Sequence, residues 1–160
     1  NARVCDNATV FDNATVYDNA RVCGYATVCG YAAVYGYATV YGYATVYGYA
    51  TVCGYATVYG YATVYGYATV YGYATVRDTA TVFDETDYAA VQGFGREQRT
   101  TTFYRLKDGE IGVSCGCFHG TIKQFRDKVK KTHGGSKYAE EYLIIADLME
   151  LHFGDETKEE

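Results

Sequence analysis

A hexapeptide recurs through the first half of this chain and constrains its fold more than any other feature. Valine occupies every sixth position from Val4 to Val82, and an alanine lies two residues before each of these valines. The common unit reads Ala-Thr-Val-Tyr-Gly-Tyr, and a last Ala-Ala-Val copy at 89–91 follows a three-residue insertion near Glu85, which gives fifteen units. Repeats of this kind indicate an architecture in which short units stack on one another.

Each Ala-Thr-Val segment predicts a very short strand, with alanine and valine on one face and threonine on the other. The glycine that follows is free to adopt a positive φ and therefore suits a corner. Because a strand of three residues is not stable alone, we expect the units to wind into a parallel β-solenoid with a thin core of alanine and valine.

Irregular positions indicate that three units complete one coil, rather than the two units of a 12-residue coil. Arg3 and Arg21 are 18 residues apart, as are Cys5 and Cys23. The first three corners are Asp-Asn pairs, at 6–7, 12–13 and 18–19, which predicts a polar capping coil at that end. About five such coils, at a strand spacing of about 4.8 Å, would form a rod of roughly 24 Å.

The Val-x-x-x-Ala-x spacing over residues 1–94 resembles that of the hexapeptide-repeat proteins. The resemblance implies a triangular left-handed parallel β-helix. This chain differs from the family pattern by placing glycine or aspartate two residues after the aliphatic residue instead of one. Many relatives resemble acyltransferases, which need a histidine base. Residues 1–94 contain no histidine, so we expect a protein that is not an enzyme.

On an 18-residue coil, threonines and tyrosines line up along the rod and form a candidate binding surface. Stacked aromatic rings add about 0.5–1.5 kcal/mol beyond burial, so a purely structural role for these rings is the alternative to recognition. The predicted surface comprises Thr9, Thr27, Thr45, Thr63, Thr81, Tyr25, Tyr31, Tyr37, Tyr43, Tyr49, Tyr55, Tyr61, Tyr67 and Tyr73.

The charge distribution excludes several functional classes. Residues 22–76 contain no Asp, Glu, Lys or Arg, and the whole chain has a net charge of −5, which argues against nucleic acid as a partner. The sequence contains no run of 18 apolar residues, so no membrane-spanning helix is predicted. An uncharged surface rich in tyrosine is typical of protein interfaces. We therefore expect a structural or binding protein whose partner is itself or another protein, with ice binding as an alternative.

Composition changes near Gly95, and residues 95–160 predict a small ββαα domain. A hairpin is expected from strands at 100–106 and 111–118 around Asp108-Gly109. A helix starting after Thr121 and ending at Gly134-Gly135 precedes a second, more apolar helix at 137–153 that starts after Ser136. We expect this domain to cover the last coil, whose strands would otherwise be open to aggregation.

The segment CGCFHGTIKQF together with KYAEEYL resembles a tail of uncharacterised proteins of gut bacteria and their phages that also carry hexapeptide arrays. The resemblance supplies no activity. It adds one alternative to self-assembly, a phage-encoded inhibitor that binds a host defence protein.

Two groups of cysteines raise the possibility of metal or redox chemistry. Cys115, Cys117 and His119 alternate, so on one strand they would share a side and, with His133, form a zinc site. The alternative is that the cysteines face a core, and no other cofactor is expected. Cys5 and its neighbour one coil later are expected to stay free thiols, because parallel strands hold their β-carbons wider than a disulfide prefers.

Overall fold

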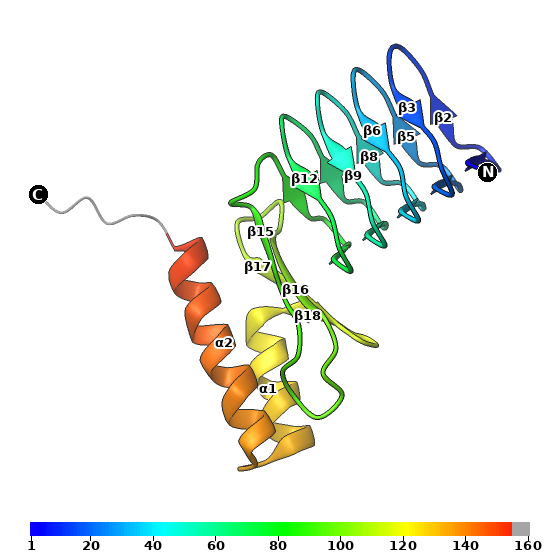
Figure 1. Ribbon diagram of the computed structural model, residues 1–160. Coiled ribbons are helices and arrows are strands. Elements are labelled where there is room, and N and C mark those ends of the chain that lie inside the picture. The colour runs from blue at the N-terminus through cyan, green and yellow to red at the C-terminus, as the bar shows by residue number, and fades with distance from the viewer. Residues whose placement is uncertain (155–160) are drawn as a thin grey trace, which may run out of the picture.

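The computed structural model describes residues 1–154 and consists of a β-solenoid followed by a compact domain of one sheet and two helices (Figure 1). The last six residues of the predicted 95–160 segment lie outside the described residues. Within residues 1–154, no helix combines the length and the hydropathy needed to cross a membrane.

Fourteen two-residue strands form the solenoid, one for each valine from Val4 to Val82. They are β1 (Arg3–Val4), β2 (Thr9–Val10), β3 (Thr15–Val16), β4 (Arg21–Val22), β5 (Thr27–Val28), β6 (Ala33–Val34), β7 (Thr39–Val40), β8 (Thr45–Val46), β9 (Thr51–Val52), β10 (Thr57–Val58), β11 (Thr63–Val64), β12 (Thr69–Val70), β13 (Thr75–Val76) and β14 (Thr81–Val82).

The strands pair in parallel with partners 18 residues away, as in Val4↔Val22 and Thr63↔Thr81, so the predicted coil of three hexapeptides is confirmed. Two faces contain five strands, β1-β4-β7-β10-β13 and β2-β5-β8-β11-β14, and the third contains four, β3-β6-β9-β12. The solenoid therefore has four complete coils and two strands of a fifth. The left-handed winding implied by the family resemblance stays a prediction.

Within the coils, the solenoid core consists of alanine and valine, and Tyr88 and Tyr104 join it at the C-terminal end. From Ala20 to Val82 the core alanine and valine side chains are at most 1 % exposed, while the residue between each pair points outward. The corners are also hydrogen-bonded from coil to coil, for example from the Tyr25 amide to the Gly42 carbonyl at 2.8 Å. Because both the strands and the corners are hydrogen-bonded from coil to coil, strands of only two residues can form a regular rod.

The first coil replaces the corner glycine by aspartate, as expected for a polar terminal coil. Asp6, Asp12 and Asp18 each have φ of 59°, a conformation that aspartate tolerates better than most residues. Their carboxylates accept hydrogen bonds from the amides of the corner glycines one coil later, at 3.1, 3.3 and 3.4 Å. The aspartates therefore tie the first coil to the second.

The C-terminal domain contains a four-stranded antiparallel sheet, in the order β15 (Tyr88–Val91), β16 (Thr101–Arg105), β17 (Ile111–Cys115) and β18 (Phe118–Thr121). The predicted hairpin is confirmed as β16 and β17. Two of the predicted details are wrong. The fifteenth Ala-Ala-Val unit does not wind into the solenoid, because β15 pairs with β16, and the second hairpin strand ends at Cys115, where Gly116 (φ 57°) turns the chain into β18.

Both predicted helices are present, as α1 (Ile122–His133) and α2 (Lys137–Phe153). Thr121 and Gln124 form a capping box at the start of α1, and Gly134 ends that helix with φ of 57°. The Ser136 hydroxyl accepts a hydrogen bond from the Ala139 amide at the start of α2. Local capping residues therefore define both helix starts.

The sheet lies between the end of the solenoid and the two helices, so its central strands β16 and β17 are buried on both faces. Tyr104 of β16 belongs to the solenoid core, whereas the adjacent Phe103 packs with the helices. The Thr75 amide donates to the Thr102 hydroxyl at 2.9 Å, and the Tyr88 hydroxyl donates to the Thr69 carbonyl at 2.7 Å. The expectation that this domain covers the last coil is confirmed.

Candidate binding surface

The corners of the solenoid determine where its tyrosines lie. Each corner glycine from Gly24 to Gly72 has φ between 67° and 73°. A Cβ added to Gly48 would lie 3.1 Å from the Gly66 amide nitrogen of the next coil, so the corner backbones stack in close contact. The tyrosines on either side of the glycine are therefore held at the edge of the prism, one on each of the two faces that meet there.

Three ladders consist of the tyrosines that follow the corner glycines, and we call them the outer ladders. Their adjacent rings are parallel within 3–5°, with centroids 5.0–5.1 Å apart. The side chains are 53–74 % exposed. The outer ladders are Tyr25-Tyr43-Tyr61, Tyr31-Tyr49-Tyr67 and Tyr37-Tyr55-Tyr73, which are the nine tyrosines predicted from the sequence.

A second set of aromatic residues, those that precede the corner glycines or aspartates, forms shorter ladders that the predicted surface did not include. We call these the inner ladders. Tyr41 and Tyr59 stack at 4.7 Å, and the Arg77 guanidinium continues their column 4.4 Å above the Tyr59 ring. Tyr47 and Tyr65 stack at 5.2 Å. The same 18-residue spacing that predicts the outer ladders would have identified these.

On each face of the solenoid, the outward-facing strand residues, mostly threonines, lie between two ladders. An outer ladder borders one side and an inner ladder borders the other, because a tyrosine precedes and another follows the Ala-Thr-Val segment of the common unit. The predicted column of Thr9, Thr27, Thr45, Thr63 and Thr81 lies on one face, and the first two hydroxyls are 3.3 Å apart. Thr27 to Thr81 are half-buried, whereas the outer-ladder tyrosines beside them are exposed.

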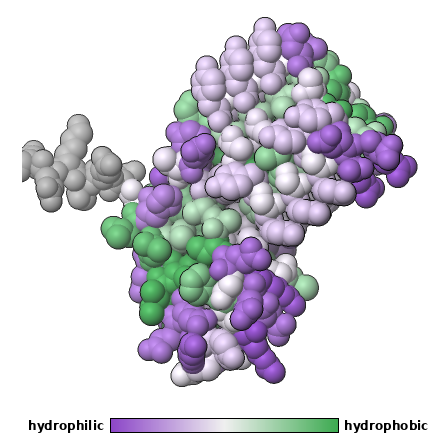
Figure 2. Space-filling view, in the orientation of Figure 1, coloured by the Kyte–Doolittle hydropathy of each residue, from purple (hydrophilic) through white to green (hydrophobic). Residues whose placement is uncertain are grey.

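Figure 2 shows the pale solenoid surface above a hydrophobic patch on the C-terminal domain. The exposed apolar side chains of α2 include Ile144, Leu148 and Leu151, which are 64 %, 54 % and 79 % exposed. Their spacing of four and three residues places them on one side of the helix. We call these three residues the α2 stripe. It is the second uncharged surface of the molecule.

The four predicted zinc ligands do not lie on one side of one strand. Cys115 ends β17, Cys117 is in the turn and His119 is in β18, opposite Ser114. His119 Nδ1 lies 3.4 Å from Asp78 Oδ2, whereas His133 packs against the Tyr142 ring with centroids 5.8 Å apart. The prediction that these residues share one side of a strand was therefore wrong, because a turn interrupts the strand.

The Cys115 side chain is part of a polar cluster inside the C-terminal domain. Its sulfur accepts a hydrogen bond from the Thr101 hydroxyl at 3.2 Å and lies 3.9 Å from the Tyr142 hydroxyl. Burial, followed by the proximity of Cys115, raises the pKa of Tyr142 to about 12. This phenol therefore stays neutral and protonated over the physiological pH range.

A different group has the proximity that a metal site needs. Among the described residues, Cys5, Asp6 and Cys23 are the cluster whose ligand atoms lie within 4.8 Å of one another. Burial, followed by the neighbouring Cys5, raises the pKa of the Cys23 thiol. Both cysteines are free thiols, in agreement with the expectation from strand spacing. The Asp6 carboxylate has a structural role, because the corresponding aspartates of the first coil make the same hydrogen bond.

A buried hydroxyl network joins the solenoid to the C-terminal sheet. The Tyr104 hydroxyl lies 3.1 Å from Ser114 Oγ and donates to Asp78 Oδ2 at 3.5 Å. Burial raises the pKa of Tyr104 well above its usual range. Asp78 also accepts from Arg77 Nε at 3.3 Å. The network fixes the position of the domain on the last coil.

One protein family matches part of this chain. A family described as the YdcK β-solenoid repeat matches residues 2–17 and 14–30, which contain the Asp-Asn corners and less than half of the chain. No curated protein and no solved structure matches. The match agrees with the parallel 18-residue coils of the structure. This chain is therefore a β-solenoid repeat protein with ladders of tyrosine and threonine.

Proposed function

We propose that this protein is a non-enzymatic binding protein that associates with a second copy of itself through the tyrosine-lined faces of the solenoid. The observation that carries the proposal is the set of three outer ladders, whose exposed rings stack at 5.0–5.1 Å along a shaft without Asp, Glu, Lys or Arg between residues 22 and 76. Interfaces favour tyrosine and lack charged residues at their centres.

A second copy suits this surface because it has the same repeat distance. Two solenoids aligned side by side would place an outer ladder of one along the threonine column of the other, and the contact would repeat in every coil. The ring faces are already stacked within each ladder, so the ring edges and phenol hydroxyls are the groups available for contact. The shaft has no like charges to keep two copies apart.

A non-enzymatic role agrees with the side chains that the solenoid presents. All three histidines belong to residues 119–152, and His119 pairs with Asp78 at the junction. The titratable groups of residues 22–76 are tyrosines and cysteines. A set of stacked phenols with high ring exposure supports binding, whereas acid–base catalysis needs a group that titrates near neutral pH.

The test compares the wild-type protein with the variant Tyr43→Arg/Tyr49→Arg/Tyr55→Arg by sedimentation velocity over a range of concentrations. Each substitution places one charge in the middle of an outer ladder. Arg77, which lies 4.4 Å above the Tyr59 ring, shows that an inner ladder accommodates arginine at its end. We expect the wild type to associate as its concentration rises and the variant to stay monomeric with an unchanged CD spectrum.

The matched control changes the other uncharged surface, with Leu148→Lys/Leu151→Lys on the α2 stripe. Association that persists in this control and is lost in the ladder variant supports the proposal. The reverse result would assign the contact to α2 and overturn the use of the ladders. A wild-type protein that is monomeric at every concentration would overturn self-association, and a thermal-hysteresis measurement on that sample would then test the ice-binding alternative.

A further inference from the structure

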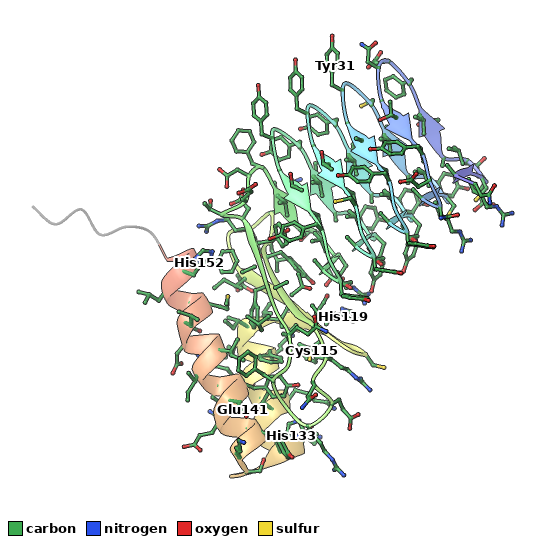
Figure 3. The ribbon with its side chains drawn as sticks, viewed as in Figure 1. Tyr31, Cys115, His119, His133, Glu141 and His152 are labelled. Atoms are coloured by element: carbon green, nitrogen blue, oxygen red, sulfur yellow. The ribbon has the colours of Figure 1, made fainter. Side chains whose placement is uncertain are left out.

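The C-terminal domain contains a pocket lined by aromatic and basic residues, which has no part in the proposed self-association. It has a volume of about 350 Å³ and is lined by the loop before β16, the end of β17, the start of β18, α1 and α2. This volume is within the usual range of small-molecule sites, about 300–1,000 Å³. Figure 3 labels Cys115 and His133, two of the lining residues, within the C-terminal domain and away from the tyrosine ladders.

The apolar part of the pocket is a cluster of aromatic rings. Phe125 meets Phe118 and Tyr142 with ring centroids 5.6 Å apart in both cases, and the contact with Tyr142 is edge-to-face. Phe125, Val129 and Tyr142 are 3–6 % exposed, and their packing fixes the shape of this wall. Aromatic rings pair favourably in offset-stacked and edge-to-face arrangements, so an aromatic ligand suits this wall.

The rim of the pocket carries unpaired positive charge. Arg96, Arg99 and Lys128 line it together with a single carboxylate, Glu97. Within residues 1–154, the ion pairs of arginine and lysine involve Arg77, Arg105, Arg126 and Lys137, and none of the three rim cations. The rim cations are exposed, so a ligand that reached them would meet donors free to form charge-assisted hydrogen bonds.

The Arg99 side chain lies against the turn that ends β17. A Cβ on Gly116 would collide with the Arg99 guanidinium, so the absence of a side chain there is what leaves room for the arginine. Gly116 has φ of 57°, which also favours glycine. The guanidinium therefore lies beside Gly116, and Arg99 lines the pocket together with Cys115 and the aromatic cluster.

We propose that this pocket binds a small aromatic anion, in which one ring packs against Phe125 and Tyr142 and a carboxylate or phosphate group contacts Arg99 and Lys128. The excess of positive over negative side chains at the rim disfavours a cationic ligand. The aromatic wall disfavours a simple inorganic anion, which would leave that wall unfilled. The hydroxyl of Tyr142 and the Cys115 sulfur supply polar contacts at the boundary between the two halves.

The test is an NMR titration of the full chain, following backbone amide shifts with four probes. Phenyl phosphate and phenylacetate are the two aromatic anions, and benzyl alcohol and inorganic phosphate are their separate halves. We expect saturable shifts at residues of the pocket with one of the aromatic anions, and a Kd at least about tenfold lower than that of either half. The tighter of the two anions identifies the head group.

Two variants and one control locate the contact. Lys128→Ala and Arg99→Gln are each expected to weaken the preferred anion by about five- to tenfold, because each removes one charge-assisted contact. Lys130→Ala, which removes an exposed lysine of the same helix outside the pocket lining, is expected to leave the Kd unchanged.

Three results would overturn the proposal. The first is that neither aromatic anion produces saturable shifts at the pocket. The second is that benzyl alcohol binds as tightly as the anions, which would indicate an apolar pocket indifferent to charge. The third is that Lys130→Ala weakens binding as much as Lys128→Ala, which would indicate a diffuse electrostatic effect.

Discussion

From Ala20 to Val82 the solenoid buries alanine and valine, whereas the C-terminal domain buries Phe103, Phe125, Tyr142 and Met149. The small side chains allow every coil to be identical, because each one fills the same narrow space. The large side chains of the domain interlock once, in one arrangement. A uniform core therefore produces a surface that repeats, and a heterogeneous core produces a pocket whose lining occurs once. Each surface follows from the packing beneath it.

The largest expected difference between the two regions is the cost of truncating a core residue. Phe125→Ala removes the ring that contacts Phe103, Phe118 and Tyr142, and we expect it to lower the free energy of unfolding by about 3–5 kcal/mol. Val46→Ala removes two methyl groups from the solenoid and should cost about 2 kcal/mol. Urea unfolding followed by CD measures both. Equal losses would contradict the comparison.

The stacked corners are the next place where the solenoid differs from the domain. Gly48 and Gly109 both have positive φ, 72° and 88°. A Cβ on Gly48 would lie 3.1 Å from the Gly66 amide nitrogen, whereas a Cβ on Gly109 has no atom within 4 Å. We expect Gly48→Ala to cost about 2–3 kcal/mol and Gly109→Ala about 1 kcal/mol, since only the first adds a backbone collision to the strain.

Thermal unfolding of these two variants separates strain from stacking. If Gly109→Ala destabilises the protein as much as Gly48→Ala, the contact between corner backbones contributes nothing measurable.

Alkaline pH tests two buried tyrosines, one in each core. Burial raises the pKa of Tyr88, in the solenoid core, and of Tyr142, in the domain core, to about 12. In the unfolded chain a tyrosine loses its proton near pH 10. Below that pH both states hold the proton and the stabilisation is complete. Above it the unfolded state loses protons first, so each of the two tyrosines lowers stability by about 2 kcal/mol between pH 10 and 12.

The unfolding free energy measured by urea titration at several pH values between 9 and 12 would reveal this slope. Tyr88→Phe and Tyr142→Phe should each reduce it. A slope that neither substitution changes would show that other groups cause the alkaline loss.

The smallest expected effect concerns stacking within an outer ladder. Tyr49 stacks on Tyr31 and Tyr67 at 5.0 and 5.1 Å, and we expect Tyr49→Ser to cost about 1 kcal/mol. Phe11 is 50 % exposed, and among the described residues it has no stacked ring, so Phe11→Ser is the matched control with little effect. Thermal unfolding of both variants gives the comparison. A control that loses as much stability as Tyr49→Ser would show that ring exposure, and not stacking, sets the cost.

Most of the solenoid could be predicted because its information is local and repeated. The six-residue period identified the strands, and the pairs Arg3/Arg21 and Cys5/Cys23 identified the 18-residue coil, which the pairing Arg3↔Arg21 confirms. The outer ladders follow from that register alone. Both helices were also predicted with their limits, because Thr121, Gly134 and Ser136 are local signals of helix ends.

The errors occur where two segments compete for one partner. The unit at 89–91 has the repeat letters, but the insertion near Glu85 moves its valine out of the 18-residue register, and β16 offers it a longer antiparallel edge. In the same way, Cys115, Cys117 and His119 alternate in sequence, but Gly116 turns the chain so that β18 returns along β17.

The sequence by itself determined the coil, its core and its rows of tyrosine, because the same local conformation and the same contacts between neighbouring coils recur in every repeat. Only the tertiary structure decided which strands the C-terminal sheet recruits and which residues meet around its pocket. Those contacts join Arg99, Cys115, Lys128 and Tyr142 from four separate segments. No period in the sequence links them, because each such contact forms once and depends on how whole elements pack against one another.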